Sequence, residues 1–156
     1  MNGYKNIVVG VDTSPQAYEV FKKAMDVAKT EGSTLHIVSA VPFIPDTDVI
    51  NTTIELGVTP SVRQEQEFAV EIKERRAILE TYVAEAKEYG VETVTLTIES
   101  DHSKNLILTE LEDFEGALIV IGASTKTPLK RFMIGSTAKY LATHAPCNIL
   151  IVKSYM

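Results

Sequence analysis

The run "KNIVVGVD" (residues 5–12) decides the fold. It is almost continuously apolar, which is typical of a strand covered on both faces of a parallel sheet. Ser14 and Pro15 follow as a helix cap and a first-turn residue, and Gly32 supplies a helix end. Between them, apolar residues recur at helical spacing: Val20, Phe21, Ala24, Met25 and Ala28. A buried strand that leads directly into an amphipathic helix predicts the first unit of an α/β fold.

The same alternation continues to the end of the chain. Further strands are expected at residues 33–41, 91–100, 116–123 and 148–153. Further helices are expected from Phe68 through Ala86 to a stop at Gly90, over residues 103–115, and from about Ser136 to His144. This order predicts a single domain over residues 1–156. Its core would be an open five-stranded parallel sheet with helices on both faces and right-handed crossovers.

Composition narrows the classes of function. The chain has 156 residues, 45% of them hydrophobic, and a formal net charge of -6, which argues against nucleic acid or an anionic membrane as partner. No apolar run approaches the roughly 18 residues of a membrane span, and the N-terminal sequence lacks the pattern of a secretory signal. We therefore expect a cytoplasmic protein. The single cysteine, Cys147, excludes an intramolecular disulfide, and we expect it at a buried strand start.

The strand ends predict where a ligand would bind. In open α/β sheets the ligand crevice lies beyond the carboxyl ends of the strands, where the strand order reverses. Asp12 follows the first strand, Ala40 and Val41 the second, and Gly122 the fourth. Asp12 either accepts hydrogen bonds from a sugar or base, or caps the first helix through its side chain.

The segment before the last helix has features of an anion site. Gly135 and Ser136 would stand at the helix N-terminus, where free N–H groups and the helix dipole attract anions. Ser136 would equally suit a plain helix cap. The only local basic cluster, Lys126, Lys130 and Arg131, lies just upstream, where it fits either an anion or a solvated loop. The NTPase loop and the dinucleotide fingerprint are both absent from the sequence.

Nothing in the sequence argues for catalysis. The three histidines, His36, His102 and His144, lie far apart, and we expect structural roles for them. The "DTDV" segment (46–49) carries two close carboxylates without further ligands at metal spacing, which is typical of a solvated loop. No nucleophile, base or carboxylate pair follows from spacing, so we expect neither an enzyme nor a protein-borne metal site.

Two segments carry a family resemblance. "IGSTAKYLATHAPCNILIVK" (134–153) and "NIVVGVDTS" (6–14) are similar to the ending and the opening of the universal stress protein family, and the match runs over nearly the whole chain. The resemblance implies a Rossmann-like fold of the adenine nucleotide alpha hydrolase-like kind, with five parallel strands and four helices. It also implies a cytoplasmic homodimer formed through the last strand, Asn148 to Lys153.

Many members of that family bind ATP through a motif written G-x2-G-x9-G-[ST]. In this chain Gly122, Gly135 and Ser136 match it, and Thr125 takes the place of the second glycine. Threonine adds bulk where the backbone approaches the phosphates, and its β-branch disfavours positive φ. Its hydroxyl, and the adjacent Lys126, can nevertheless contact phosphate.

The resemblance also implies roles for individual residues. Val11 and Asp12 would flank adenine and ribose, with Ala40 or Val41 on the other side of the base. The phosphates would lie against the remaining positions, Gly122, Thr125, Lys126, Gly135, Ser136 and Thr137. The expected ligand is ATP or AMP, with Mg²⁺ accompanying the triphosphate.

The implied function is a stress-response module controlled by an adenine nucleotide. One alternative is a dimeric regulator that binds no nucleotide and acts through protein contacts of the loop from Pro42 to Pro60. Another is a weak nucleotide hydrolase, for which the sequence identifies no base.

Overall fold

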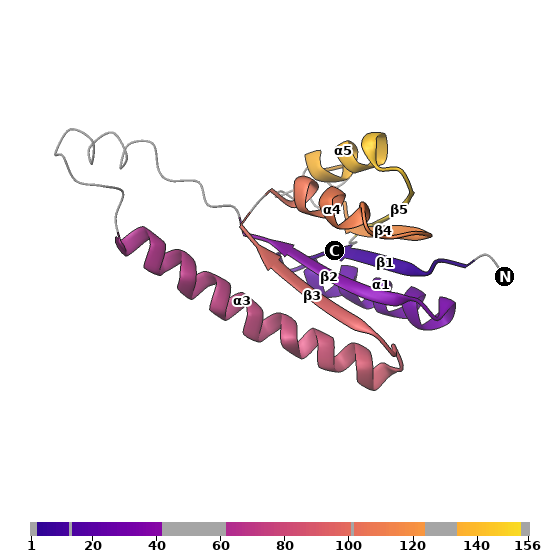
Figure 1. Ribbon diagram of the computed structural model, residues 1–156, viewed down its shortest axis with the longest axis horizontal. Coiled ribbons are helices and arrows are strands. Elements are labelled where there is room, and N and C mark those ends of the chain that lie inside the picture. The colour runs from indigo at the N-terminus through magenta and orange to yellow at the C-terminus, as the bar shows by residue number, and fades with distance from the viewer. Residues whose placement is uncertain (1–2, 13, 42–61, 101, 124–133, 154–156) are drawn as a thin grey trace.

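The computed structural model describes residues 3–12, 14–41, 62–100, 102–123 and 134–153. Within these ranges strand and helix alternate as expected (Figure 1). The strands are β1 (Asn6–Gly10), β2 (Thr34–Ala40), β3 (Val94–Glu99), β4 (Ala117–Gly122) and β5 (Asn148–Val152). The helices are α1 (Ala17–Glu31), α3 (Val62–Tyr89), α4 (Ser103–Leu111) and α5 (Ser136–His144).

The strands form one sheet in the order β3-β2-β1-β4-β5, and every neighbouring pair is parallel. The predicted open five-stranded parallel sheet is therefore confirmed. β1 lies at the centre, and the chain builds outward from it first through β2 and β3 and then through β4 and β5. The strand order thus reverses between β1 and β4, and a crevice is expected beyond their carboxyl ends.

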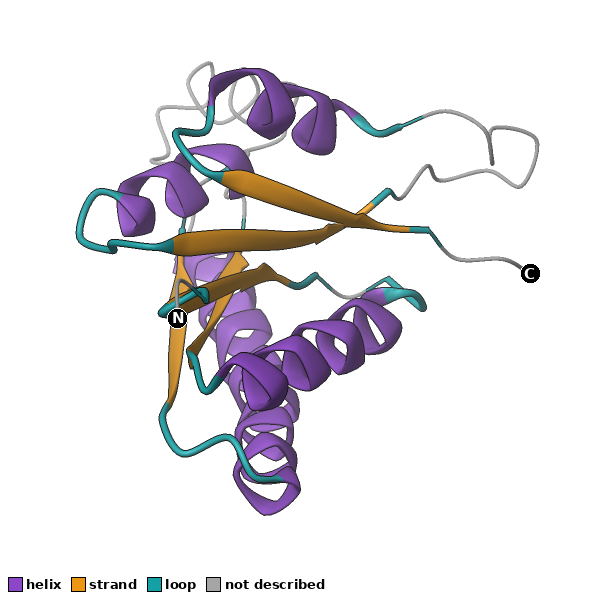
Figure 2. Cartoon of the chain, turned by 90° about the vertical axis from the view of Figure 1, so that its right-hand side faces the viewer, coloured by secondary structure: helices purple, strands orange, loops and turns teal. Residues whose placement is uncertain are grey.

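Helices cover both faces of the sheet, as Figure 2 shows. Strand side chains alternate between two cores because successive residues point to opposite faces. In β2, for example, Leu35 and Ile37 belong to the core shared with α1 and α3, whereas Val38 belongs to the core shared with α4 and α5. Both faces of the central strands are apolar for this reason.

The first helix begins later than the sequence suggested. Gln16, not Ser14, occupies the N-cap position, and no side chain caps the helix there. Asp12 Oδ1 instead accepts the Ser14 N–H at 2.8 Å, and the Ala17 N–H donates to the Ser14 carbonyl at 3.1 Å. The chain therefore makes a side-chain-supported turn before the helix starts, and Pro15 lies in that turn.

The third predicted helix, over residues 103–115, is also shorter than expected. α4 ends at Leu111, so Phe114 lies beyond the helix rather than on its face. The Phe114 ring stacks on His36 of β2, with ring centroids 3.9 Å apart. Packing against a buried histidine competes here with continuation of the helix.

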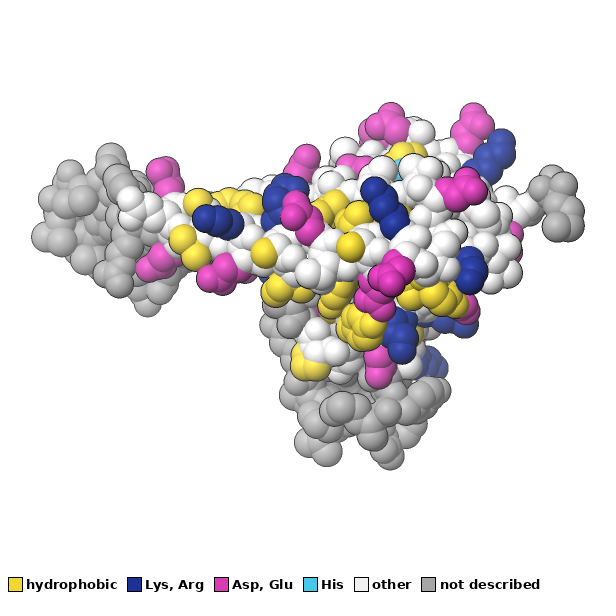
Figure 3. Space-filling model, turned by 90° about the horizontal axis from the view of Figure 1, so that it is seen from below, with side chains coloured by type: hydrophobic (Ala, Val, Ile, Leu, Met, Phe, Trp, Pro, Cys, Tyr) yellow, Lys and Arg dark blue, Asp and Glu magenta, His cyan; other side chains and the backbone are white. Residues whose placement is uncertain are grey.

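α3 is long and only partly covered. Figure 3 shows apolar side chains along it, interspersed with charged ones. Leu79 and Ala86 are buried against the sheet, whereas Val70 and Ile78 are each 53% exposed. One face of the helix therefore belongs to the core, and another presents apolar groups to solvent.

Candidate functional site at the strand crossover

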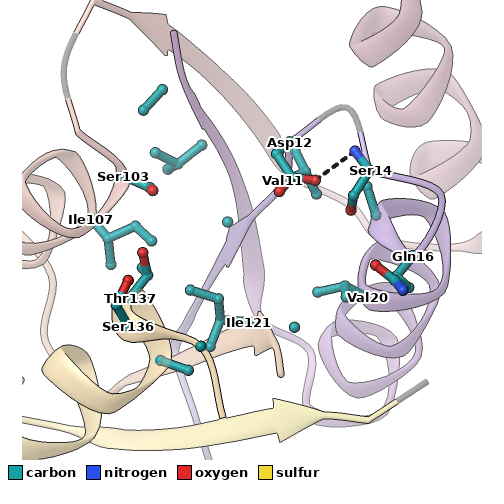
Figure 4. A pocket seen from close by; sticks show the side chains of 17 residues that line it. Val11, Asp12, Ser14, Gln16, Val20, Ser103, Ile107, Ile121, Ser136 and Thr137 are labelled. Atoms are coloured by element: carbon teal, nitrogen blue, oxygen red, sulfur yellow. Dashed lines mark hydrogen bonds between the residues drawn. The ribbon is translucent and has the colours of Figure 1, made fainter. Parts of the chain in front are cut away.

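A pocket of about 260 Å³ lies where the strand order reverses. Its lining comes from the ends of β1, β2 and β4 and from the starts of α1, α4 and α5 (Figure 4). Parallel strands deliver their carboxyl ends, and the helices that follow deliver their amino ends, to the same edge of the sheet. The fold therefore gathers at this edge the first backbone N–H groups of several helices, which have no acceptor within their own helix.

The N-terminus of α5 forms one wall. Gly135 is the N-cap, and the first intrahelical bond runs from the Lys139 N–H to the Gly135 carbonyl at 3.0 Å. The N–H groups of Ser136, Thr137 and Ala138 precede that bond and have no intrahelical acceptor. No side chain caps the helix, so Ser136 is the first helical residue and not its cap. Figure 4 shows the hydroxyls of Ser136 and Thr137 pointing into the pocket.

The Gly135 N–H has a different role from the one the resemblance implied. It donates to the Ala123 carbonyl at 3.3 Å instead of facing a ligand. This bond joins the end of β4 to the start of α5. Gly135 therefore contributes shape to the wall, while the next three residues contribute the available donors.

Asp12 forms the opposite wall together with Val11. One Asp12 carboxylate oxygen holds the Ser14 N–H, and this accounts for the side chain's orientation in Figure 4. Asp12 is also the one acidic or basic side chain among the described lining residues. An anionic ligand would therefore depend on the α5 N-terminus for its electrostatic attraction.

The floor of the pocket is apolar. Val20, Val38, Ile107 and Ile121 line it, and Gly10 provides close approach to the backbone of β1. An apolar floor with polar groups on opposite walls suits a ligand that has a flat apolar part and an anionic part.

The structure brings together most of the residues selected from the sequence. These are Val11, Asp12, Ala40, Gly122, Gly135, Ser136 and Thr137. Val41 is not among the lining residues, because its side chain is fully buried in the core shared with α1 and α3. Of the two residues considered for the base, only Ala40 lines the pocket. Thr125, Lys126, Lys130 and Arg131 lie outside the described residues.

Sequence reasoning missed Ser103, Ser14 and Gln16, which also line the pocket. Ser103 opens α4, just after the third strand. Residues that follow the carboxyl ends of the first, second and fourth strands were selected as ligand contacts. Applied to the third strand, the same rule would have selected Ser103. Ser14 and Gln16 had no comparable signal, because they line the pocket through the unpredicted turn before α1.

The other residues considered from the sequence have structural surroundings. His144 ends α5, and its Nδ1 lies 2.9 Å from the Tyr140 carbonyl. Cys147 immediately precedes β5 and is partly buried, and this burial raises the pKa of its thiol. The segment 46–49 lies outside the described residues. In the described part of the chain, no three His, Cys, Asp or Glu side chains gather closely enough to hold a metal ion.

The fold and the pocket define a class: α/β proteins with a doubly wound parallel sheet and a pocket at its crossover. Comparison with known proteins identifies the family. The model of the universal stress protein family matches residues 3–153, and the chain belongs to that family. A Staphylococcus haemolyticus protein named as a universal stress protein is 31% identical over 97% of this chain and 86% of its own length.

Solved structures show the same fold. The universal stress protein UspA from Lactobacillus plantarum has a TM-score of 0.78 and 22% identity, covering 96% of this chain and 98% of its own. A universal stress protein solved in complex with cAMP has a TM-score of 0.64 and 18% identity, covering 96% and 97%. Within the described ranges, no helix combines the length and the apolar character that a membrane crossing requires.

Proposed function

We propose that this universal stress protein binds an adenine nucleotide, ATP or AMP, in the crossover pocket and acts in the cytoplasm as a regulatory module. The observation that carries the proposal is the pocket itself. Its wall at α5 offers three backbone N–H groups without intrahelical acceptors, and its opposite wall offers Asp12 above an apolar floor. The family member solved with cAMP adds support, because cAMP is itself an adenine nucleotide.

The proposed pose places the base and the phosphates at opposite walls. Adenine would lie over the apolar floor beside Val11 and Ala40, with Asp12 accepting from ribose hydroxyls. The phosphates would accept from the N–H groups and hydroxyls of Ser136 and Thr137. Mg²⁺ would enter with ATP through its phosphate oxygens. We propose binding without catalysis.

Calorimetry on ligand-stripped protein tests this proposal. Saturable binding of ATP with Mg²⁺, at about one nucleotide per chain, is expected. Gly135→Val should abolish binding, since a β-branched side chain would intrude on the phosphate wall. The chain should still fold, because the backbone at Gly135 (φ -64°, ψ 162°) suits valine. Thr143→Val, an exposed change farther along the same helix, is the matched control. Retained binding in Gly135→Val would contradict the phosphate placement.

Thr125→Gly restores the glycine of the family motif. Tighter ATP binding is expected if threonine bulk is what weakens the site. If the wild-type protein shows neither heat nor thermal stabilisation at sub-millimolar ATP, nucleotide control is excluded.

A regulator that acts only through protein contacts is the second candidate. The observation that favours it is the exposure of two large apolar side chains on α3, Val70 and Ile78, since apolar groups presented by one helix suit a protein partner. ATP binding to the wild-type protein discriminates between the two functions, because this candidate requires none.

We further propose that the chain forms a homodimer through β5. This strand is at the sheet edge, and four of its residues, Ile149 to Val152, are only partly buried. Sedimentation analysis should find a dimer. Since the Ala123 N–H bonds to the Val152 carbonyl, the alternate residue Ile151 directs its N–H to the free edge. Ile151→Pro should therefore give a folded monomer, and an unchanged dimer would exclude this edge as the interface.

A further inference from the structure

Arg75 is a buried cation on α3 that sequence reasoning did not select. It is 7% exposed, although arginine is rarely buried without a paired anion. Its Nη1 donates to the Ser39 hydroxyl at 3.0 Å and to the Ala40 carbonyl at 2.8 Å. Both acceptors belong to the carboxyl end of β2, and Ala40 lines the crossover pocket.

The Ala40 carbonyl needs a partner because of the sheet's geometry. In β2, Leu35 and Val41 bond through their N–H groups toward β3, whereas the Val38 carbonyl bonds toward β1, accepting the Val11 N–H. Successive residues of a strand direct their N–H and carbonyl groups toward opposite neighbouring strands. The Ala40 carbonyl, two residues after Val38, therefore also faces the β1 side. There the chain has already turned away at Asp12 toward α1. Arg75 thus takes the place of the missing strand neighbour.

The arrangement is costly for stability alone. Among the described residues, the anion paired with Arg75 is Glu71, which lies 3.3 Å from Nη2 and whose side chain is 54% exposed. The Arg75 Nε is buried and has no hydrogen-bond partner among the described residues. A buried ion pair that is incompletely satisfied is often no better than apolar packing of the same shape. The geometry therefore favours a role in placing β2 over a role in stabilising the fold.

We infer that Arg75 is a positioning residue for the nucleotide. From α3 it holds the carboxyl end of β2, and hence the wall at Ala40 against which the base would lie. This inference rests on the proposed nucleotide binding. It deepens that function by naming a residue that acts on the base and not on the phosphates.

The test compares Arg75→Met, which keeps the buried stem and removes the donors, with Arg75→Lys and with the exposed neighbour Arg76→Met as control. Calorimetry measures ATP with Mg²⁺ and, separately, inorganic triphosphate. Arg75→Met should weaken ATP binding about tenfold, the factor that corresponds to loss of one charge-assisted hydrogen bond. Its affinity for triphosphate should change little, since triphosphate would not reach the wall at Ala40. Its melting temperature should fall modestly, because the Ala40 carbonyl loses its donor. Arg75→Lys should restore part of the ATP affinity, and Arg76→Met should match wild type.

The outcomes separate this inference from the proposed function. If wild type binds ATP and Arg75→Met binds it equally well, the inference is overturned while the function stands. A parallel loss of ATP and triphosphate binding would also overturn it, because that pattern indicates general loosening. Absence of ATP binding in wild type would overturn both. If Arg75→Met does not fold, Arg75→Lys decides. A loss of ATP affinity with unchanged triphosphate affinity would support positioning. If the ratio of ATP affinity to triphosphate affinity equals that of wild type, the inference is overturned.

Discussion

Replacing His36 by leucine removes a buried histidine whose two ring nitrogens are both engaged. Asn6 Nδ2 donates to the Glu115 carbonyl at 2.8 Å, so Asn6 Oδ1 is the atom that faces His36. His36 Nε2–H therefore donates to Oδ1 at 2.8 Å, and in the neutral ring Nδ1 accepts the Thr95 hydroxyl at 2.7 Å. The change deletes two hydrogen bonds worth about 1 kcal/mol each, and leucine keeps part of the contact with Phe114. We expect a loss of about 2 kcal/mol in the free energy of unfolding at about pH 8.

The same histidine makes stability depend on pH. Burial lowers the pKa of His36 below its ordinary value. As pH falls below about 6.5, the unfolded chain takes up the proton first, so protonation favours unfolding. The stability is fully present above the unfolded pKa and declines as pH falls toward the folded pKa. His36→Leu lacks this contribution and should lose less stability between about pH 8 and about pH 5.5 than wild type does.

Urea denaturation at several pH values measures both effects. His144→Leu is the control, because it makes the same chemical change at an exposed histidine. It should keep the wild-type pH dependence that comes from His36. If wild type and His36→Leu lose equal stability over this pH range, the reasoning from burial is refuted.

Three further predictions concern the glycines and the core. Gly32→Ala should cost about 1 kcal/mol by urea denaturation, since φ is 69° and an added Cβ would meet nothing within 4 Å; an unchanged midpoint would contradict a backbone cost. Phe21→Ala should lower the free energy of unfolding by about 3–5 kcal/mol, because this fully buried ring stacks on Tyr82 with ring centroids 4.6 Å apart. A smaller loss than that of Tyr18→Ala in the same urea denaturation would show that neighbouring side chains move in to fill the cavity. Gly10→Ala would place a Cβ 2.9 Å from Ile107 Cδ1 in the pocket floor, so calorimetry should find weaker ATP binding with about 1 kcal/mol of lost stability; equal affinity would show that Ile107 yields away from the pocket.

The order of elements was predictable because buried strands and amphipathic helices leave different periodicities. The strand run at 5–12 and the helical face ending at Gly32 both correspond to elements of the structure, β1 and α1. The helix boundaries were less predictable, because tertiary contacts set them. The Asp12 side chain delays the start of α1, and the packing of Phe114 on His36 accompanies the early end of α4.

The site was predictable where a rule about strand ends applied. Asp12, Ala40 and Gly122 follow strands and line one pocket. The choice between Ala40 and Val41 depended on which residue faces which side of β2, and a shift of one residue reverses that. Arg75 could not be found at all, because its acceptors in β2 are more than thirty positions away in the sequence and its helical neighbours are ordinary charged residues.

The pocket has a consequence for how a nucleotide could regulate this protein. Its walls come from both halves of the sheet, with Asp12 and Ala40 on one side of the crossover and Ser136 and Thr137 on the other. A ligand that contacts both walls stabilises the chain by mass action, by about 2.7 kcal/mol at a hundredfold excess over its Kd. A bound ligand shifts an equilibrium between two conformations only if it binds one of them more tightly than the other. It can therefore alter the protein surface only through an element that contacts the pocket and is also exposed to solvent. Through Arg75, α3 meets both conditions: it holds the wall at Ala40, and it exposes Val70 and Ile78. Nucleotide control and protein contacts would then be successive steps of one mechanism, with α3 connecting them.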